Sequence, residues 1–385
     1  MKRLVGRLCW AAAMCAAVAA VGCTTHKQIF SEPEVLGGEE IDAETLNMGR
    51  TSYMLYCYAC HGEEGDGKGP AAYAYWPPPR DFRKVSFKFA GVPEGDVPTD
   101  DELRRIVLNG LNGTAMLPWD VPEEDVWLAI QYLKTFSPEK KGWRHPRKKP
   151  VAPTIAPDPF FVIPRVAVWD DDAFDEWADE QREAGQQVPG DAKGLEEFRK
   201  QKRAEAVAKQ AEAIQKGATQ YHAGGCQLCH AAYVPPDQIV AWGGAPRATY
   251  PYDSDPKYSK TYEVVLVPPD FYRHPVRSAK QYWDADGNLR YDALDFYRVI
   301  ASGIPGTAMP SWAALPPEQV WAVAYYTASL SEQRYSPEAM QRRAELLALP
   351  PWTPPAPEPE PAPDVPAEGA PAKPEPAEAQ PETTP

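Results

Sequence analysis

Apolar residues follow a helical period in two well-separated parts of the chain. Over residues 99–110, apolar side chains spaced three and four apart fall on one face of a helix, and Thr99 with Glu102 has the form of a capping box. A second segment, over residues 294–300, repeats this spacing just before Gly303. The pattern therefore predicts two amphipathic helices of similar length.

The elements around these two helices also occur twice, in the same order. Each is followed by an apolar helix that begins at a proline and preceded by a helix with glycine and tyrosine four residues apart. The paired segments are residues 122–136 and 316–330, and the paired residues are Gly49 with Tyr53 and Gly217 with Tyr221. A repeat of this kind indicates one helical unit in two copies. A long charged helix is expected over residues 194–220, leading into the second copy.

A short apolar stretch lies at the N-terminus. Residues 8–21 follow a basic start and are too few to span a bilayer, which needs about 20 residues, so they are typical of a secretory signal peptide. The stretch ends in Ala-Val-Gly before Cys23, which resembles the lipobox of bacterial lipoproteins. The resemblance implies a signal peptide over residues 1–22, lipidation of Cys23, and a position on the periplasmic side of a bacterial membrane. Ordinary cleavage nearby or an uncleaved anchor is the alternative.

Composition distinguishes the remaining segments. The chain has 44 prolines, more than helices can accommodate. Residues 351–385 are mostly proline, alanine and acidic residues, and are therefore predicted to be disordered. Residues 138–204 are predicted to be a Pro-rich and helical linker, with a solvated basic cluster over residues 140–149. The formal net charge of −14 disfavours nucleic acid as a partner.

Two cysteine motifs carry the candidate chemistry. The pattern C-x-x-C-H occurs as Cys57, Cys60 and His61, and again as Cys226, Cys229 and His230. This pattern is the signature of c-type haem attachment, in which each cysteine bonds a haem vinyl group and the histidine binds the iron. A redox C-x-x-C pair does not require the histidine, and a zinc knuckle needs further cysteine or histidine ligands. Two covalently attached haem c groups, each with its iron, are therefore expected.

The two units resemble class I cytochrome c domains, and the whole chain resembles a tandem, dihaem cytochrome c. After its amphipathic helix, each unit has a Gly-Thr-Ala-Met turn, which ends at Met116 and at Met309. The resemblance implies that these methionines are the sixth iron ligands. Their soft thioether, paired with histidine, raises the reduction potential of a haem. His274 is the rival ligand in the second unit.

The resemblance also implies the domain organisation. The expected fold is all-α, with two class I cytochrome c domains, a Pro-rich and helical linker between them, and a disordered tail. The expected segments are a signal peptide over residues 1–22, a tether over 23–41, domain 1 over 42–137, a linker over 138–204, domain 2 over 205–331, a C-terminal helix over 332–350, and the tail over 351–385.

A haem-ligating histidine normally donates its second ring N–H to an acceptor. In class I cytochromes this acceptor is a proline carbonyl soon after the motif, which points to Pro70 for His61. Arg80 is a candidate partner of a haem propionate, because the guanidinium group suits a carboxylate, with a solvated surface arginine as the alternative. The second unit lacks the Gly-rich loop, and Pro235 and Pro246 both remain candidates for its acceptor.

Haem iron with two protein ligands has no open position for a substrate, which favours electron transfer over catalysis. The expected function is single-electron transfer between redox partners. Expected donors are a quinol-oxidising complex or a periplasmic dehydrogenase, and expected acceptors are a soluble cytochrome or a haem–copper oxidase. The alternative is a dihaem enzyme, such as a cytochrome c peroxidase-like oxidoreductase, in which one haem opens a coordination position. A thiosulfate dehydrogenase with a distal cysteine is disfavoured, because no mature cysteine is spare.

Overall fold

The structure is a computed structural model, which describes residues 29–75, 77–246, 271, 276, 279–284, 287–350 and 352–353. This part of the chain consists mainly of α-helices with two short hairpins, which confirms the expected all-α fold class. None of its helices combines the length and the apolar run needed to cross a membrane. The expected signal peptide, Cys23, His274 and nearly all of the expected tail lie outside the described residues.

The first helical unit begins with a short antiparallel hairpin and continues with α-helices and 3-10 turns. Its elements are β1 (Glu34–Leu36), β2 (Glu39–Ile41), α2 (Ala43–Tyr56), α3 (Tyr58–His61), η1 (Ala72–Ala74), η2 (Phe82–Lys84), α4 (Asp100–Asn109), α5 (Glu123–Lys134) and η3 (Gly142–Arg144). Helices α2 and α5 cross at Gly49, where a Cβ would lie 2.2 Å from the carbonyl oxygen of Leu128. The glycine therefore permits this close crossing.

The second helical unit repeats this arrangement with a longer first helix. Its elements are α7 (Ala192–Ala223), η5 (Cys226–Leu228), α8 (Pro236–Ala241), β3 (Gln281–Trp283), β4 (Leu289–Tyr291), α9 (Ala293–Ser302), α10 (Pro317–Glu332) and α11 (Pro337–Leu347). Helices α7 and α10 cross at Gly217, where a Cβ would lie 2.0 Å from the carbonyl oxygen of Ala322. The same residue type thus sets the same crossing in both units.

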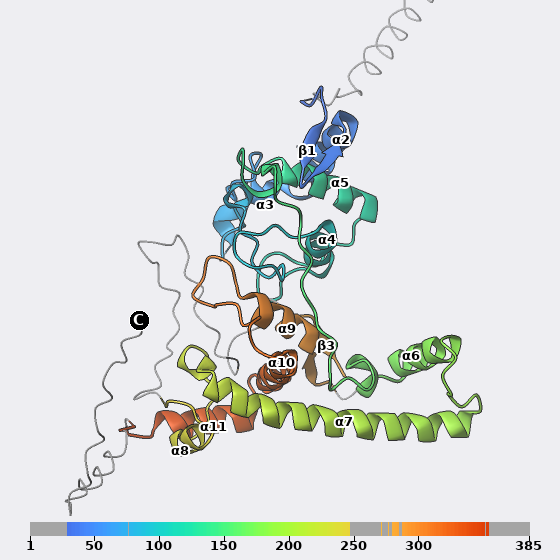
Figure 1. Cartoon of the computed structure of the whole chain (residues 1–385), viewed down its shortest axis with the longest axis vertical. Helices are drawn as coiled ribbons and strands as arrows, with labels where there is room; N and C mark the ends of the chain where they lie inside the picture. Colours follow the sequence, from blue (N-terminus) through green and yellow to red (C-terminus); the bar gives the residue numbers. More distant parts are fainter. Residues whose placement is uncertain are drawn as a thin grey trace, which may run out of the picture.

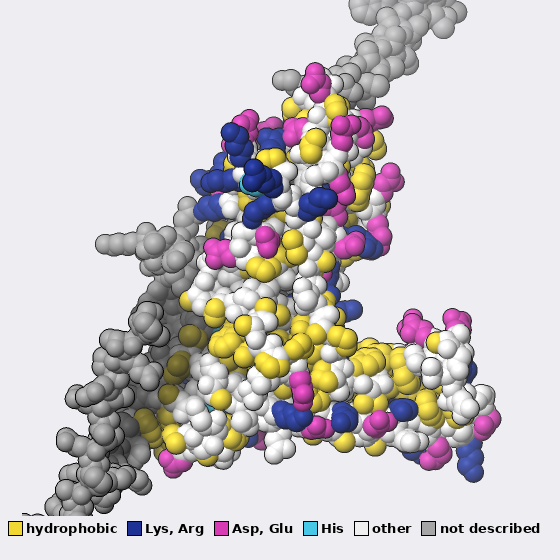
Figure 2. All heavy atoms as spheres, in the orientation of Figure 1, with side chains coloured by type: hydrophobic (Ala, Val, Ile, Leu, Met, Phe, Trp, Pro, Cys, Tyr) yellow, Lys and Arg dark blue, Asp and Glu magenta, His cyan; other side chains and the backbone are white. Residues whose placement is uncertain are grey.

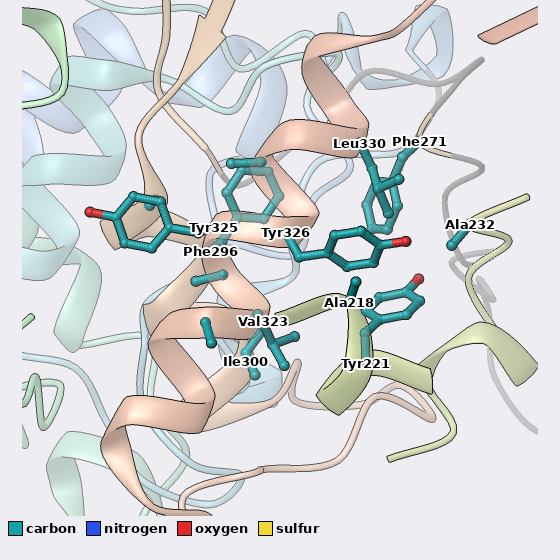
Figure 3. Packing of buried hydrophobic residues seen from close by; sticks show 14 of the residues in the cluster. Ala218, Tyr221, Ala232, Phe271, Phe296, Ile300, Val323, Tyr325, Tyr326 and Leu330 are labelled. Atoms are coloured by element: carbon teal, nitrogen blue, oxygen red, sulfur yellow. The ribbon is translucent and has the colours of Figure 1, made fainter. Parts of the chain in front are cut away.

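A pair of tyrosines packs beside each crossing. The rings of Tyr53 and Tyr132 have centroids 5.3 Å apart in the first unit. Those of Tyr221 and Tyr326 have centroids 5.2 Å apart in the second, where they lie at the centre of the core (Figure 3). The repeat predicted from the sequence is therefore present in the packing of the two cores.

The chain between the two units has two parts. Its first part packs on the first unit, and its later part projects from the second unit. Trp143 is buried, and its carbonyl accepts the amide of Gly37 at 2.7 Å, so the segment directly after α5 lies on the first unit instead of spanning freely between units. Lysine and arginine side chains gather on one flank of this unit (Figure 2). Further along, η4 (Val166–Val168), α6 (Asp171–Glu183) and the first half of α7 form an arm that projects from the second unit (Figure 1).

The predicted capping box at the start of α4 does not form. Thr99 is the N-cap residue, but its side chain makes no capping hydrogen bond. The carboxylate of Glu102 instead accepts from the guanidinium of Arg105 at 3.0 Å. Either contact of this carboxylate is a charge-assisted hydrogen bond, so the position of the Arg105 guanidinium one turn further along α4 decides between them.

Candidate haem sites

The first C-x-x-C-H motif forms a tight helical turn at the end of α2. The amide of Cys57 donates to the carbonyl of Tyr53 at 2.8 Å, and the amide of His61 donates to the carbonyl of Cys57 at 2.9 Å. Short α3 therefore continues almost directly from α2 and contains Cys60. The two thiols and the imidazole are thereby held on a single turn of backbone.

The imidazole of His61 is held from two sides. Its ring stacks on that of Phe82, with centroids 4.4 Å apart and planes at 17°. Its Nδ1 lies 3.1 Å from the carbonyl oxygen of Arg80. An imidazole that donates its Nδ1–H to this oxygen presents Nε2 as the ligand atom for iron.

The acceptor for His61 is thus the carbonyl of Arg80, and the prediction of Pro70 was wrong. The physical reason lies in the Gly-rich loop. A Cβ at Gly67 would lie 2.5 Å from the carbonyl oxygen of Pro79, so the chain around Arg80 runs directly against this loop and comes within reach of the imidazole. The predicted role of the Arg80 side chain toward a haem propionate stays a prediction; its Nε donates to the carbonyl of Ser86.

The second motif has the same local geometry. The amide of His230 donates to the carbonyl of Cys226 at 2.8 Å, and the amide of Cys229 donates to the same oxygen at 3.1 Å. The ring of His230 stacks on that of Phe271, with centroids 5.4 Å apart and planes at 13°. Of the two predicted acceptors, Pro235 already accepts two amides at the start of α8.

A tyrosine hydroxyl anchors the end of each motif. The hydroxyl of Tyr53 donates to the carbonyl of Gly62 at 2.8 Å, and that of Tyr221 donates to the carbonyl of His230 at 2.7 Å. Each tyrosine comes from the helix that leads into its motif, four residues after the crossing glycine. Because the glycine and the tyrosine are four residues apart in both units, the helix crossing also determines where the tyrosine hydroxyl holds the motif.

The two methionine turns have nearly the same hydrogen bonds. The carbonyl of Met116 accepts the amide of Leu111 at 2.7 Å, and the carbonyl of Met309 accepts the amide of Ile304 at 3.1 Å. In each turn, the amide of the methionine donates to the hydroxyl of the threonine two residues earlier, at 3.1 Å. Both methionine side chains are half-buried.

Each methionine turn begins at a glycine with a positive φ, which follows the last residue of α4 or α9. Gly110 has φ 65° and Gly303 has φ 73°. A Cβ at Gly110 would lie 2.5 Å from the amide nitrogen of Pro118, and one at Gly303 would lie 2.7 Å from the amide nitrogen of Ser311. Each turn therefore folds back tightly on the end of its helix.

Burial disfavours the charged forms of three residues in the two motifs. It raises the pKa of the Cys57 thiol to about 12 and that of Cys226 to about 11. It also lowers the pKa of His61, and the bond to the carbonyl of Arg80 opposes this only in part. A neutral imidazole of fixed orientation fits the role of a haem-ligating histidine.

The aromatic partners of the two histidines were not predicted to have this role. The only sequence signal is the recurrence of Phe82 and Phe271 after a pair of prolines in each unit. No three His, Cys, Asp or Glu side chains are grouped for direct metal binding within the described ranges.

Comparisons with known proteins give one family match. A family model described as "Cytochrome C oxidase, cbb3-type, subunit III" matches residues 44–133, which run from α2 to α5. A search of curated proteins found no match. Among solved structures, a chain of a reducing HAO-like protein complex from Kuenenia stuttgartiensis is 22% identical, with 74% of this chain and 95% of that chain covered at a TM-score of 0.46.

Proposed function

We propose that this chain is a c-type cytochrome that carries electrons on two covalently bound haem c groups. The family match over residues 44–133 supports the first of these haems. The observation that carries the proposal is the recurrence of one attachment geometry. In both units a tyrosine hydroxyl anchors the motif, and a phenylalanine ring stacks on the histidine. The second unit therefore has the local features expected of a second haem site.

We further propose that Met116 and Met309 complete the coordination of the two irons. The equal hydrogen bonding of the two turns supports equal roles for the two side chains. A bound haem c supplies one-electron chemistry at its iron. His61 and His230 would each supply an imidazole ligand, Met116 and Met309 would each supply a thioether, and no coordination site would be left for a substrate. This arrangement favours a carrier over an enzyme.

The proposed location is the periplasmic side of a bacterial membrane, with a lipid on Cys23. The first described residue, Ile29, follows Cys23 by six positions, and its amide donates to the side chain of Asn47 in α2. A short tether would thus keep the first unit close to the lipid surface. A Cys23→Ser variant that still fractionates with membranes would contradict lipid anchoring.

Redox proteins are the proposed partners. Donors would be a quinol-oxidising complex or a periplasmic dehydrogenase, and acceptors would be a soluble cytochrome or a haem–copper oxidase. The matching family model carries the name of an oxidase subunit, which supports the last of these. Purification of the lipidated protein from its native membrane, followed by identification of co-purifying haem proteins, tests this set.

The number of haems is tested by the haem-to-protein ratio of the exported protein. The wild type is expected to carry two haems per chain, and a Cys226→Ala/Cys229→Ala variant one. The matched variant Cys57→Ala/Cys60→Ala should also carry one. A wild-type ratio of one would refute the two-haem proposal.

The ligands are tested by the visible charge-transfer band of oxidised Met–Fe haem. Met116→Ala and Met309→Ala should each remove about half of this band, and Met54→Ala, which replaces a methionine of α2, should leave it intact. Wild-type protein should react neither with carbon monoxide nor with peroxide. A fast reaction with peroxide would favour the peroxidase-like alternative.

A further inference from the structure

The two helical units meet through four charged side chains on α4 and α9. Arg105 of α4 lies 3.5 Å from Asp295 of α9, and Arg298 of α9 lies 4.0 Å from Glu102 of α4. Each arginine also pairs within its own helix, Arg105 with Glu102 at 3.0 Å and Arg298 with Asp295 at 2.8 Å. We refer to these four residues as the charged quartet.

The charged quartet is built from equivalent residues of the repeat. Arg105 precedes Gly110 by five residues, as Arg298 precedes Gly303, and each acid stands three residues before its arginine. Each unit therefore offers the same acid–base pair to the other. Such self-complementary contact is the isologous geometry of two-fold dimers, realised here inside a single chain.

The quartet is largely withdrawn from water. The side chains of Arg105 and Arg298 are 19% and 15% exposed, and those of Glu102 and Asp295 are 11% and 7% exposed. Two further hydrogen bonds hold members of the quartet. Arg105 donates to the carbonyl of Phe89, and the amide of Lys280 donates to Asp295. Pairs with fixed hydrogen bonds and little solvent impose a definite orientation, in contrast to exposed surface pairs.

The same interface contains both methionine turns. Asn112, four residues before Met116, donates its side-chain amide to the carbonyl of Ala279 in the second unit at 2.6 Å. From the other side, Gly306, three residues before Met309, lies against Ser86 of the first unit, whose hydroxyl is 3.7 Å from the position of a Cβ. Each turn thus contacts the opposite unit.

We propose that the charged quartet positions the two methionine turns, and with them the two haem sites, for electron exchange within one chain. The partner of each haem unit is then the other unit, docked in one register. This inference rests on the proposed function, because it concerns two haem sites. Arg105, Glu102, Arg298 and Asp295 act as positioning residues, because all four lie outside the C-x-x-C-H motifs and the methionine turns.

The test uses haem-loaded, full-length protein with Arg105→Gln, Asp295→Asn and the double variant. The control is Arg104→Gln, the neighbouring residue on α4, which pairs with Glu123 inside the first unit and is 40% exposed. Two readouts are compared: the separation of the units by small-angle X-ray scattering, and the rate of electron exchange between the haems after flash reduction of one of them. The separation is a readout that does not depend on redox activity.

Each single variant leaves a poorly solvated charge without its partner across the interface. The ratio of docked to separated units should therefore fall about tenfold or more, with a larger scattering radius and a slower exchange rate. The double variant should lose less than the sum of the two single variants, because it removes both charges of one pair. The control should match the wild type in both readouts.

Unchanged separation and exchange rate in both single variants would overturn the inference. If the quartet variants fail to fold, the inference is tested with Asn112→Ala, because this change removes the contact with Ala279 without leaving a buried charge. A separation and an exchange rate equal to those of the wild type in Asn112→Ala would also overturn the inference. Failure of the proposed function has a different signature. In that case the wild type itself would lack the second haem or the Met–Fe bands, whatever the separation of its units.

Discussion

The ring of His61 lies flat on the ring of Phe82, with centroids 4.4 Å apart and planes at 17°. This contact comes from a 3-10 turn that follows the motif by about twenty residues, so it restricts the rotation of the imidazole independently of the backbone that holds it. The second unit keeps the relationship between His230 and Phe271. Both histidines are therefore held by an aromatic face.

Replacing Phe82 by leucine should let the His61 imidazole rotate more freely, while the haem stays attached. The lost ring contact is worth about 1 kcal/mol beyond the buried area, and the unfolding free energy of the haem-loaded protein should fall by about that amount. The reduction potential of the first haem should shift, because the histidine samples more orientations. Redox titration with chemical unfolding checks both effects. Phe161→Leu, at an exposed ring in the linker, should change neither; an unaltered potential in Phe82→Leu would exclude an orienting role.

Adding a methyl group at either helix crossing should be strongly destabilising. A Cβ at Gly49 or at Gly217 would overlap a backbone carbonyl of the opposing helix, which cannot move without separating the helices. We expect Gly49→Ala and Gly217→Ala each to lower the free energy of unfolding by about 1–3 kcal/mol or more. Thermal unfolding measures this. Gly190→Ala, where a Cβ would have no neighbour within 4 Å, is the matched control, and equal melting of all three variants would disprove the crossing argument.

Lys134 and Asp100 form an ion pair inside the first unit, and removal of either partner should lower the unfolding free energy by a different amount. Lys134 is 2% exposed, with its ammonium 2.7 Å from Asp100 and 2.9 Å from the side chain of Gln131. Asp100→Asn leaves this buried charge without its counterion and should cost about 3 kcal/mol in unfolding free energy. Lys134→Met should cost less, because methionine fills the space without a charge. Denaturant titration compares them, and a larger loss in Lys134→Met would contradict the expected order.

A buried histidine makes stability depend on pH below neutrality. His222 is fully buried, its Nδ1 donates to the carbonyl of Ala218, and the rings of Trp242 and Tyr326 pack against it. Burial lowers its pKa from the ordinary value of about 6.5. Below about pH 6.5 the unfolded chain therefore binds a proton that the folded chain does not, and stability decreases as the pH falls toward the lowered value.

His222→Phe should remove this part of the pH dependence. Unfolding midpoints measured between about pH 5 and 8 test this, because the titration of the unfolded imidazole lies inside that range. His145→Gln, at a half-buried histidine of the linker, should keep the wild-type slope. If the His222→Phe slope equals that of the wild type, another group is responsible.

The local sequence pattern was sufficient to predict the helices and to identify the two C-x-x-C-H motifs. Apolar residues at helical spacing predicted α4, α5, α9 and α10, because an amphipathic face depends only on neighbours along the chain. The C-x-x-C-H motifs are local as well, and the match to a cytochrome model over residues 44–133 agrees with the first of them. The roles assigned to Met116 and Met309 stay predictions, supported by the equal geometry of their turns.

The sequence by itself determined the all-α class, the two copies of the helical unit and the two C-x-x-C-H motifs, since all of these follow from short-range spacing. Only the tertiary structure decided which groups meet across long separations. It placed the carbonyl of Arg80, not that of Pro70, beside the imidazole, and it turned Glu102 from a capping residue into a contact of Arg298. Such choices depend on which backbone segments pack together. The energies of competing hydrogen bonds are similar, and only position in space selects among them.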